Sequence, residues 1–319
     1  MIKRWPADRR GFALIAALWL LVAIMAVGLG FGLRARMRHL AAANAIEATR
    51  ARRVADAGLA DCHARLVQLL GTGGAPIGRA GLIRDPWAPA LAQPIDTVIL
   101  ASARAVVSMR DPGARLHLNR ASEAELGRLF VALRIDAGLA DRLAQRIMDW
   151  RDPDELRRPR GAERAAYLEA GAPVVPANGP FARLGDLRDV LGMTPEVYDS
   201  IRPYLTLEGA GRVNFMAASR PVLLALPGMT EQAAAVVLAR RTTGRPIRSV
   251  TDLADQLPSG ARSLMVDSLP LLEPQVTFET NELVAESIAG VDGSPVRVSV
   301  RGLFERAGNA VLLVQREAE

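Results

Sequence analysis

Three acidic residues of this 319-residue chain are spaced in a way that suits a hard cation. Asp152 and Asp154 stand two residues apart, and Glu163 follows in the same polar segment. Alternate carboxylates on an extended backbone can converge on one point, and Ca²⁺ takes six to eight oxygen ligands. The alternative is a solvated charged loop in which nearby arginines neutralise these acids. The arginines concerned are Arg151, Arg157, Arg158, Arg160 and Arg164.

Other site chemistries lack their residues. Lys3 is the only lysine, so the body of the chain has no P-loop or Schiff-base lysine. His39, His63 and His117 are too scattered for the usual zinc motifs, and the sequence contains no G-x-S-x-G. Two carboxylates can be chosen from residues 152–163, but nothing supplies the nucleophile, base and orienting partner of a catalytic site. We therefore expect no catalytic residues and no enzyme activity.

The N-terminal region carries a candidate membrane span. Residues 12–33 are 22 residues without a charge, which as a helix is about 33 Å long against a hydrocarbon core of roughly 30 Å. Arginines at positions 34, 36 and 38 follow the span directly, where an ordinary signal peptide would have a small-residue cleavage site. The pattern predicts a transmembrane helix.

The junction before this span resembles a type IV prepilin signal. A short basic leader ends in Arg9-Arg10-Gly11, and the apolar helix begins at Phe12. The resemblance implies that prepilin peptidase cleaves after Gly11 on the cytoplasmic side and methylates Phe12. Most pilins have glutamate at the fifth mature position, where this chain has Ala16. The K subunits of type II secretion lack that glutamate and are larger than their relatives, and both features match.

The rest of the chain divides by its residue patterns. Proline-free helical periodicity continues after the span until Gly71, and β-branched alternating segments lie on either side of a long stretch rich in Ala, Leu and Arg. We predict an α+β fold in which a large helical domain is inserted into a small antiparallel sheet. The expected parts are a prepilin leader (1–11), the transmembrane part of the N-terminal helix (12–33), its periplasmic part (34–70), a pilin-like sheet region (71–115 and 273–319) and the inserted helical domain (116–272).

The inserted stretch contains a weak internal repeat. The segment that starts at His117 matches the one that starts at Asn214, at an offset of 97 residues. Ser122, followed three residues later by Glu125, is a capping box, so each copy is expected to open a helix at its serine. The equivalent serine of the second copy is Ser219.

The second copy resembles the helix-hairpin-helix modules of DNA-uptake proteins, so DNA binding is a competing function. In such modules a tight glycine hairpin lets backbone N–H groups reach a phosphate. Here Thr230 replaces the second hairpin glycine, and the first copy lacks the hairpin. We therefore favour a protein-binding or purely structural role for two helix-hairpin-helix or SAM-like repeats.

The strongest family resemblance lies around the acidic segment. The run Asp149-Trp150-Arg-Asp152-Pro-Asp154, then Gly-Ala-Glu ending at Glu163, then NGPF from Asn178, resembles type II secretion protein K (general secretion pathway protein K). The resemblance implies calcium at Asp152, Asp154 and Glu163, and a helical pair in the insert. Trp150 is expected to anchor a core, with binding of a partner as the alternative.

This family resemblance implies a structural role. The expected protein is a minor pseudopilin at the tip of the type II secretion pseudopilus, in contact with I- and J-type pseudopilins, prepilin peptidase and the inner membrane. It would cross the inner membrane once, with its N-terminus cytoplasmic before cleavage and its bulk periplasmic. No nucleic acid is expected as a partner. The alternatives are a DNA-binding protein or a minor pilin of a related type IV fibre.

Overall fold

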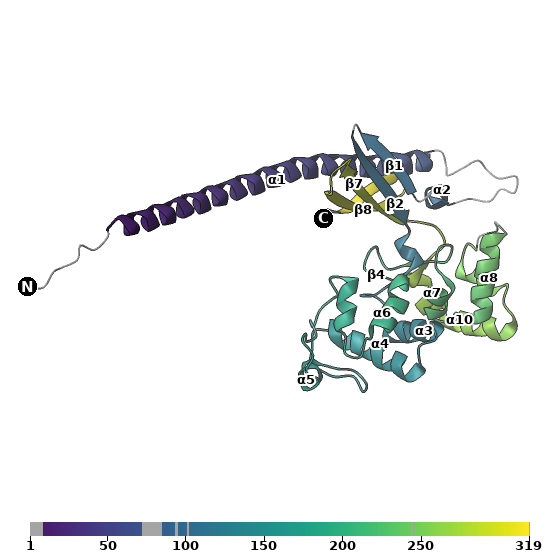
Figure 1. Cartoon of the computed structure of the whole chain (residues 1–319). Coiled ribbons are helices and arrows are strands. Elements are labelled where there is room, and N and C mark those ends of the chain that lie inside the picture. The colour runs from purple at the N-terminus through teal and green to yellow at the C-terminus, as the bar shows by residue number, and fades with distance from the viewer. Residues whose placement is uncertain are drawn as a thin grey trace, which may run out of the picture.

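The computed structural model describes residues 9–71, 85–92, 95–100, 102–243, 245 and 247–318. Within these residues a long N-terminal helix leads to a five-stranded sheet, and a helical body lies beside the sheet (Figure 1). A long helix, a small antiparallel sheet and a helical domain are the parts that the α+β prediction named.

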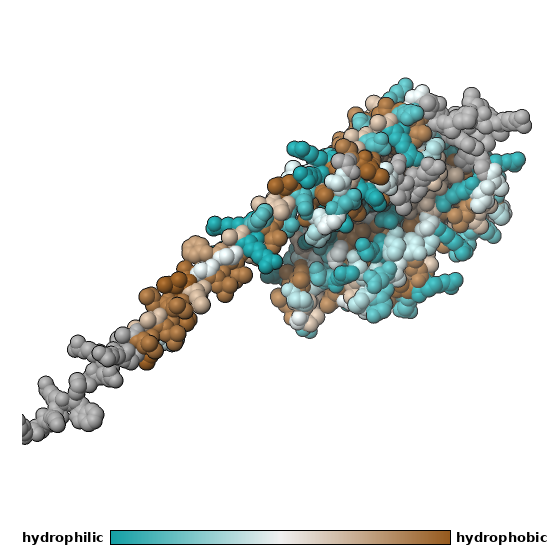
Figure 2. Space-filling view, turned by 45° about the horizontal axis from the view of Figure 1, so that its top comes forward, coloured by the Kyte–Doolittle hydropathy of each residue, from teal (hydrophilic) through white to brown (hydrophobic). Residues whose placement is uncertain are grey.

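Helix α1 (Arg9–Gly71) projects far beyond the rest of the molecule. It is 63 residues long, and among the described residues it is the one helix long and apolar enough to cross a membrane, with a hydropathy of 2.6 in its best window. The large apolar side chains between Leu14 and Leu33 are exposed, and Figure 2 shows this stretch in brown. Protein covers none of that window, which is what a lipid-facing segment requires. The predicted leader lies outside the described residues except for 9–11, where only the backbone is described.

The second half of α1 packs against the sheet along one stripe. Gly58 is the point of closest approach, because a Cβ atom there would lie 2.5 Å from Ser287 Oγ and 2.8 Å from Val107 Cγ2. Only glycine lets the helix lie this close to the strands. The Cys62 side chain is part of this stripe and is only 3% exposed. The buried stripe consists of Ala51, Ala55, Leu59, Cys62 and Leu66.

The sheet has the order β1-β2-β7-β8-β9, and every neighbouring pair is antiparallel. Arg110 at the end of β2 pairs with Val284 near the start of β7, so the whole helical body leaves and re-enters between two adjacent strands. This is the predicted insertion into a sheet. The strands are β1 (Ile95–Leu100), β2 (Ala103–Arg110), β7 (Glu282–Val291), β8 (Arg297–Ala307) and β9 (Ala310–Ala318).

The helical body has its own core, separate from the core between α1 and the sheet. Its helices are short, and two pairs of two-residue strands tie the body together. The helices are α3 (Glu123–Ala132), α4 (Ala137–Arg151), α5 (Arg164–Glu169), α6 (Pro195–Ile201), α7 (Arg220–Ala225), α8 (Glu231–Thr242), α9 (Val250–Ala254) and α10 (Ser259–Leu272), and the strands are β3 (Leu116–His117), β4 (Leu205–Thr206), β5 (Val213–Asn214) and β6 (Val276–Thr277). One further short helix, α2 (Ala88–Ala92), lies before β1.

The two sequence repeats have corresponding elements. Each copy opens with a short strand, which pairs in parallel with a strand at the end of the same copy. As predicted, Ser122 is the N-cap of α3 and forms a capping box with Glu125. Ser219 is the N-cap of α7 without a side-chain bond, since a valine stands where the first copy has its glutamate.

The hairpin of the second repeat is covered on one side by α10. Gly228 has a positive φ of 68°, and a Cβ atom there would lie 2.6 Å from Ser268 Cβ and 3.0 Å from the carbonyl oxygen of Leu264. The hairpin glycine is therefore needed for packing within the body. This observation favours the structural role of the repeat over DNA binding, and its assignment as a helix-hairpin-helix stays a prediction.

Candidate functional site

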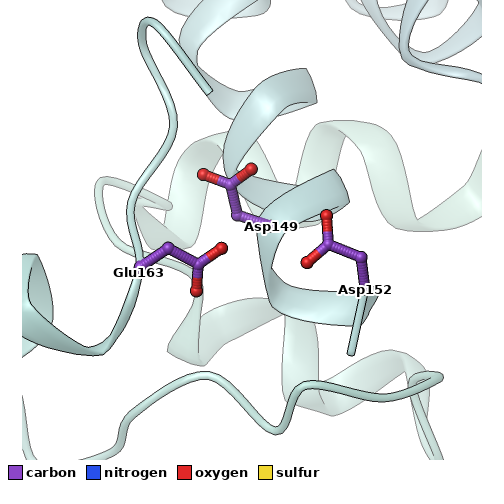
Figure 3. Close-up of side chains that lie close together, drawn as sticks. All are labelled: Asp149, Asp152 and Glu163. Atoms are coloured by element: carbon purple, nitrogen blue, oxygen red, sulfur yellow. The ribbon is translucent and has the colours of Figure 1, made fainter. Parts of the chain in front are cut away.

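Three carboxylates meet at the end of α4. Carboxylate oxygens of Asp149, Asp152 and Glu163 lie within 4.8 Å of one another. Asp149 belongs to the last turn of α4, Asp152 is its C-cap, and Glu163 is the N-cap residue of α5. Figure 3 shows the three side chains turned toward a common space between the helix end and the loop. Residues three apart share one side of a helix, so the chain presents the two aspartates together.

A group of aromatic rings fixes the end of α4. Trp150 is 3% exposed and stacks on Phe181, with ring centroids 5.7 Å apart and an interplanar angle of 8°. The ring of Tyr167 lies 6.0 Å from it at a tilt of 56°. Trp150 is thus the core anchor that the sequence predicted, and it holds the turn between the two aspartates.

A glycine brings the returning loop against the helix. A Cβ atom at Gly161 would lie 1.8 Å from Asp149 Oδ2, so any side chain there would displace the carboxylate. The next residue, Ala162, is 1% exposed. This close approach places Glu163 beside the aspartates, and it is the physical reason for the Gly-Ala-Glu element.

The cluster contains buried carboxylate oxygens that lack a donor. Glu163 is 4% exposed, and among the described residues neither of its oxygens, nor Asp152 Oδ1, has a hydrogen-bond partner. Burial, together with the charges of Asp149 and Asp152, raises the pKa of Glu163 to about 7. Unpaired buried carboxylates are costly unless a cation or donors balance them. A divalent cation at this point would supply that balance.

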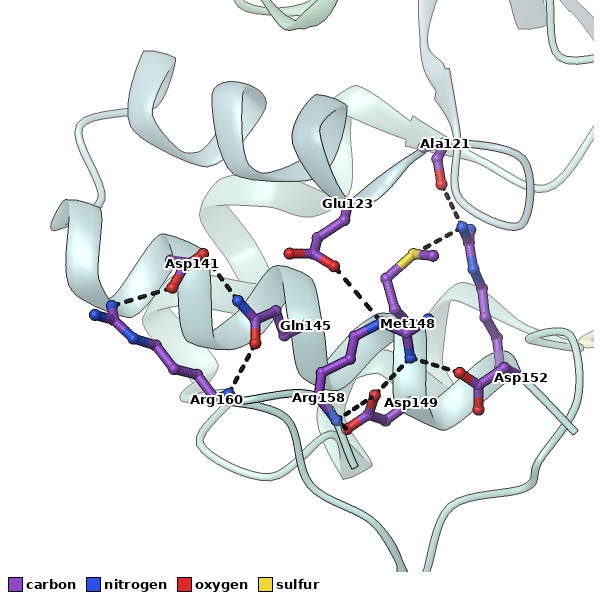
Figure 4. Close-up of polar contacts among 10 residues, drawn as sticks. Ala121, Glu123, Asp141, Gln145, Met148, Asp149, Asp152, Arg158 and Arg160 are labelled. Carbon is purple, nitrogen blue, oxygen red and sulfur yellow. Dashed lines mark hydrogen bonds and ion pairs between the residues drawn. The ribbon is translucent and has the colours of Figure 1, made fainter. Parts of the chain in front are cut away.

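One arginine partly balances the cluster. Arg158 Nη1 lies 2.6 Å from Asp149 Oδ1 and 2.5 Å from Asp152 Oδ2, and its Nε lies 3.5 Å from Glu123 (Figure 4). It forms no ion pair with Glu163 among the described contacts. Arg158 is thus the one guanidinium described at the three-carboxylate cluster, and it pairs with the two aspartates only. Glu163, which has no partner among the described residues, is the acid whose pKa is raised.

Other arginines of the segment are engaged elsewhere. Arg151 donates to the backbone carbonyl groups of Leu118 and Ala121. Arg160 Nη1 lies 3.0 Å from Asp141 Oδ2 on the outer side of α4 (Figure 4). Arg157 and Arg164 form no ion pair with the three carboxylates among the described contacts. The solvated-loop alternative therefore depends on Arg158, which does not pair with Glu163.

The structure groups the predicted ligands differently from the sequence. Asp152 and Glu163 come together, whereas Asp154 is exposed, is absent from the group, and accepts a hydrogen bond from the backbone N–H of Leu156 at 2.8 Å. Asp149 takes its place. The sequence could have indicated Asp149 only through its position three residues before Asp152 on a helix. Its complete burial cannot be predicted without knowing the path of the loop that contains Gly161.

The processing site has no described side-chain geometry. Gly11 and Phe12 lie in the backbone of α1, and their side chains are outside the described residues. Their assignment continues to depend on the resemblance to a prepilin signal.

Fold and site together define a class: an α+β protein with a membrane-length N-terminal helix and a helical insert that carries an acidic cluster. Residues 104–209 match the family model of type II secretion system (T2SS) protein K, and this segment contains the cluster and the first repeat. The sequence-based recognition of protein K agrees with this match over residues 104–209.

One curated protein and one solved structure are similar to this chain. A protein of Escherichia coli (strain K12) described as a type II secretion system protein K is 31% identical over 120 residues. That alignment covers 35% of this chain and 37% of the relative. A chain in the crystal structure of the GspK-GspI-GspJ complex from the enterotoxigenic E. coli type 2 secretion system has a TM-score of 0.59 and 17% identity. It covers 90% of this chain and 99% of that chain, so nearly the whole fold is shared.

Proposed function

We propose that this chain is a minor pseudopilin, a structural subunit at the tip of the type II secretion pseudopilus, and that it serves protein export across the outer membrane. The observation that carries the proposal is the fold shared over 90% of the chain with a member of the GspK-GspI-GspJ complex. The protein K match over residues 104–209 supports it independently, from the sequence.

The shape of the molecule is consistent with a tip position. The exposed apolar half of α1 would lie in the inner membrane, and the sheet and the helical body lie together at the other end of the helix (Figure 1). The body is inserted between two paired strands, so it adds bulk beside the sheet without interrupting it. In a filament, the next subunit toward the tip would collide with the helical body. The bulk of this body therefore favours a position at the tip, where no further subunit follows.

The partners follow from the same comparison. The solved complex contains GspI and GspJ, so we propose I- and J-type pseudopilins as the partners of this chain. The contacts would include α1, because the part of this helix that follows the predicted span carries exposed apolar residues such as Met37, Leu40 and Ile46. The bulk would be periplasmic.

We further propose that Asp149, Asp152 and Glu163 bind calcium. Hard oxygen ligands, buried oxygens without donors and a net negative charge suit this ion. It would stabilise the loop between α4 and α5, with backbone carbonyl groups and water completing the shell. No chemistry beyond this structural role is proposed.

Processing by prepilin peptidase provides a test of the pseudopilin class. We expect the mature protein to begin with methylated Phe12 when the full chain is expressed with the peptidase, because a basic leader ends at Gly11 against a continuous apolar helix. Mass spectrometry of the intact protein measures this directly. A host without the peptidase is the control and should yield the uncleaved chain. An N-terminus beyond His39 in the first host would contradict the proposal.

A further inference from the structure

A cleft lies between the sheet and the helical body. Its volume is about 820 Å³. The floor is the face of the sheet opposite α1, and residues 181–188 and 202–208 of the helical body form the walls. The cleft is distinct from the acidic cluster, because none of the three carboxylates there lines it.

Positive charge is concentrated in this cleft. Six arginines line it against three glutamates, which are Glu208, Glu286 and Glu317. The whole chain, by comparison, has 40 basic and 34 acidic residues. The arginines are Arg110, Arg115, Arg183, Arg188, Arg202 and Arg301.

Two arginines on the floor of the cleft already bind carboxylates of the chain itself. Arg110 lies 2.6 Å from Glu208 and 3.9 Å from Glu286. Arg301 reaches the same two glutamates, at 3.5 and 3.3 Å. Each carboxylate is thus shared between two guanidinium groups, an arrangement in which charge-assisted hydrogen bonds are strong.

The walls carry guanidinium groups that remain available. Among the described contacts, the guanidinium groups of Arg115 and Arg202 form no ion pair or hydrogen bond, and the guanidinium of Arg188 lies 4.3 Å above the ring of Tyr198. Burial, together with the positive charge of Arg110, lowers the pKa of Arg115. Unpaired positive charges in a partly buried cleft favour an anionic occupant.

The size and lining of the cleft favour a peptide over a small anion. The cleft is much larger than a small inorganic anion needs, and Leu184, Leu207 and Leu303 add apolar surface that inorganic phosphate would not use. Gln315 and Glu317 of β9 form the rim. Strand β9 is the last in the sheet, with no described strand on its outer side, so its free edge can receive an extended chain.

We propose that this cleft binds an acidic, extended segment of a partner protein, with the partner's carboxylates paired to Arg115 and Arg202 and its backbone lying along the rim at β9. The apolar lining from Leu184, Leu207 and Leu303 and the free edge of β9 suit an acidic peptide better than the sugar-phosphate backbone of a nucleic acid. The inference concerns a binding surface of this chain and does not depend on a tip position.

Binding of a model peptide to the full chain in nonionic detergent tests the proposal. The probe is a fluorescein-labelled decapeptide of alternating glutamate and alanine, and the readout is fluorescence anisotropy. A peptide with glutamine in place of glutamate is the control. We expect saturable binding of the acidic peptide only, and an affinity that falls as salt is raised, because the contacts are ionic.

Variants of opposite expected sign make the test specific. Arg115→Gln with Arg202→Gln should weaken binding at least about tenfold. Glu317→Gln should strengthen it by removing a competing carboxylate at the rim. Arg142→Gln, at an exposed position of α4 that does not line the cleft, should leave it unchanged.

Three results would overturn the proposal. The first is no saturable binding by the wild-type chain. The second is an equal loss of affinity in the Arg142→Gln control, which would indicate general surface charge. The third is full displacement of the peptide by inorganic phosphate or a DNA duplex at the same concentration of negative charge. If the double arginine variant fails to fold, the gain expected for Glu317→Gln decides the matter.

Discussion

Calcium at millimolar concentration is expected to raise the melting temperature of the wild-type protein, and Glu163→Gln is expected to abolish that rise. A ligand that binds only the folded state at about a hundred times its dissociation constant stabilises it by about 2.7 kcal/mol. For a folded region of this size that corresponds to roughly 5–10 °C. The physical reason is that both oxygens of Glu163 are buried and find no donor among the residues that the structure describes. Differential scanning fluorimetry with calcium or a chelator provides the measurement.

Asp154→Asn is the matched control for this experiment. Asp154 belongs to the same loop and was a ligand in the sequence-based prediction, but the structure leaves it outside the cluster. Its variant should retain the full calcium shift, whereas Asp149→Asn should lose it. Arg158→Gln should bind calcium more tightly, since it removes the cation that pairs with two of the ligands. An unchanged melting curve of the wild-type protein, with no metal by elemental analysis, would contradict calcium binding. The negative charge of the cluster would then be neutralised by Arg158 and not by a metal ion.

Trp150→Ala is expected to lower the free energy of unfolding by about 3–5 kcal/mol, the range for removing a large buried aromatic side chain. The indole is 3% exposed and contacts the rings of Phe181 and Tyr167, so its loss would leave a cavity between α4, α5 and the following loop. Urea unfolding of the full chain in detergent, followed by circular dichroism, measures the change. The variant should also lose the calcium shift, because Trp150 fixes the turn between Asp149 and Asp152.

Two variants bracket this effect. Leu156→Ala changes an apolar residue of the same segment that is 78% exposed, and we expect it to alter stability by less than about 0.5 kcal/mol. Trp150→Phe retains an aromatic ring for stacking and should cost less than the alanine variant. A loss below about 1 kcal/mol for Trp150→Ala would show that the ring is not the anchor of the helix end.

Local patterns in the sequence were sufficient for most of the fold. The uncharged run before Arg34 predicts the part of α1 that projects beyond the sheet. The alternating segments predict the strands on either side of the insert. The capping box of Ser122 and Glu125 places the start of α3. Each of these features depends on residues a few positions apart, which is why periodicity and capping chemistry reveal them.

The acidic cluster could be predicted only in part. Asp152 and Glu163 were identified as ligands because of their spacing and a family resemblance, whereas Asp149 lies on the buried side of a helix. Its proximity to Glu163 depends on the path of the loop over Gly161, where a Cβ atom would collide with Asp149. Contacts of this kind are set by tertiary packing and leave no periodic signal.

The arginine-lined cleft had no signal in the sequence. Arg110 and Arg301 are almost two hundred residues apart, yet both contact Glu208 and Glu286. Only the antiparallel pairing of β2, β7 and β8 brings them to one face. The net charge of +6 is a property of the whole chain and carries no information on which residues gather at one face.

If this chain is a tip subunit, it should form a complex with the small pseudopilins of the same secretion system. The full chain, co-expressed with its I- and J-type pseudopilins and extracted in mild detergent, should purify as a single complex with one copy of each, measured by native mass spectrometry. A major pseudopilin added to the mixture should bind only on the side away from the helical body. Recovery of the chain alone, or as a repeating polymer of itself, would contradict the claim.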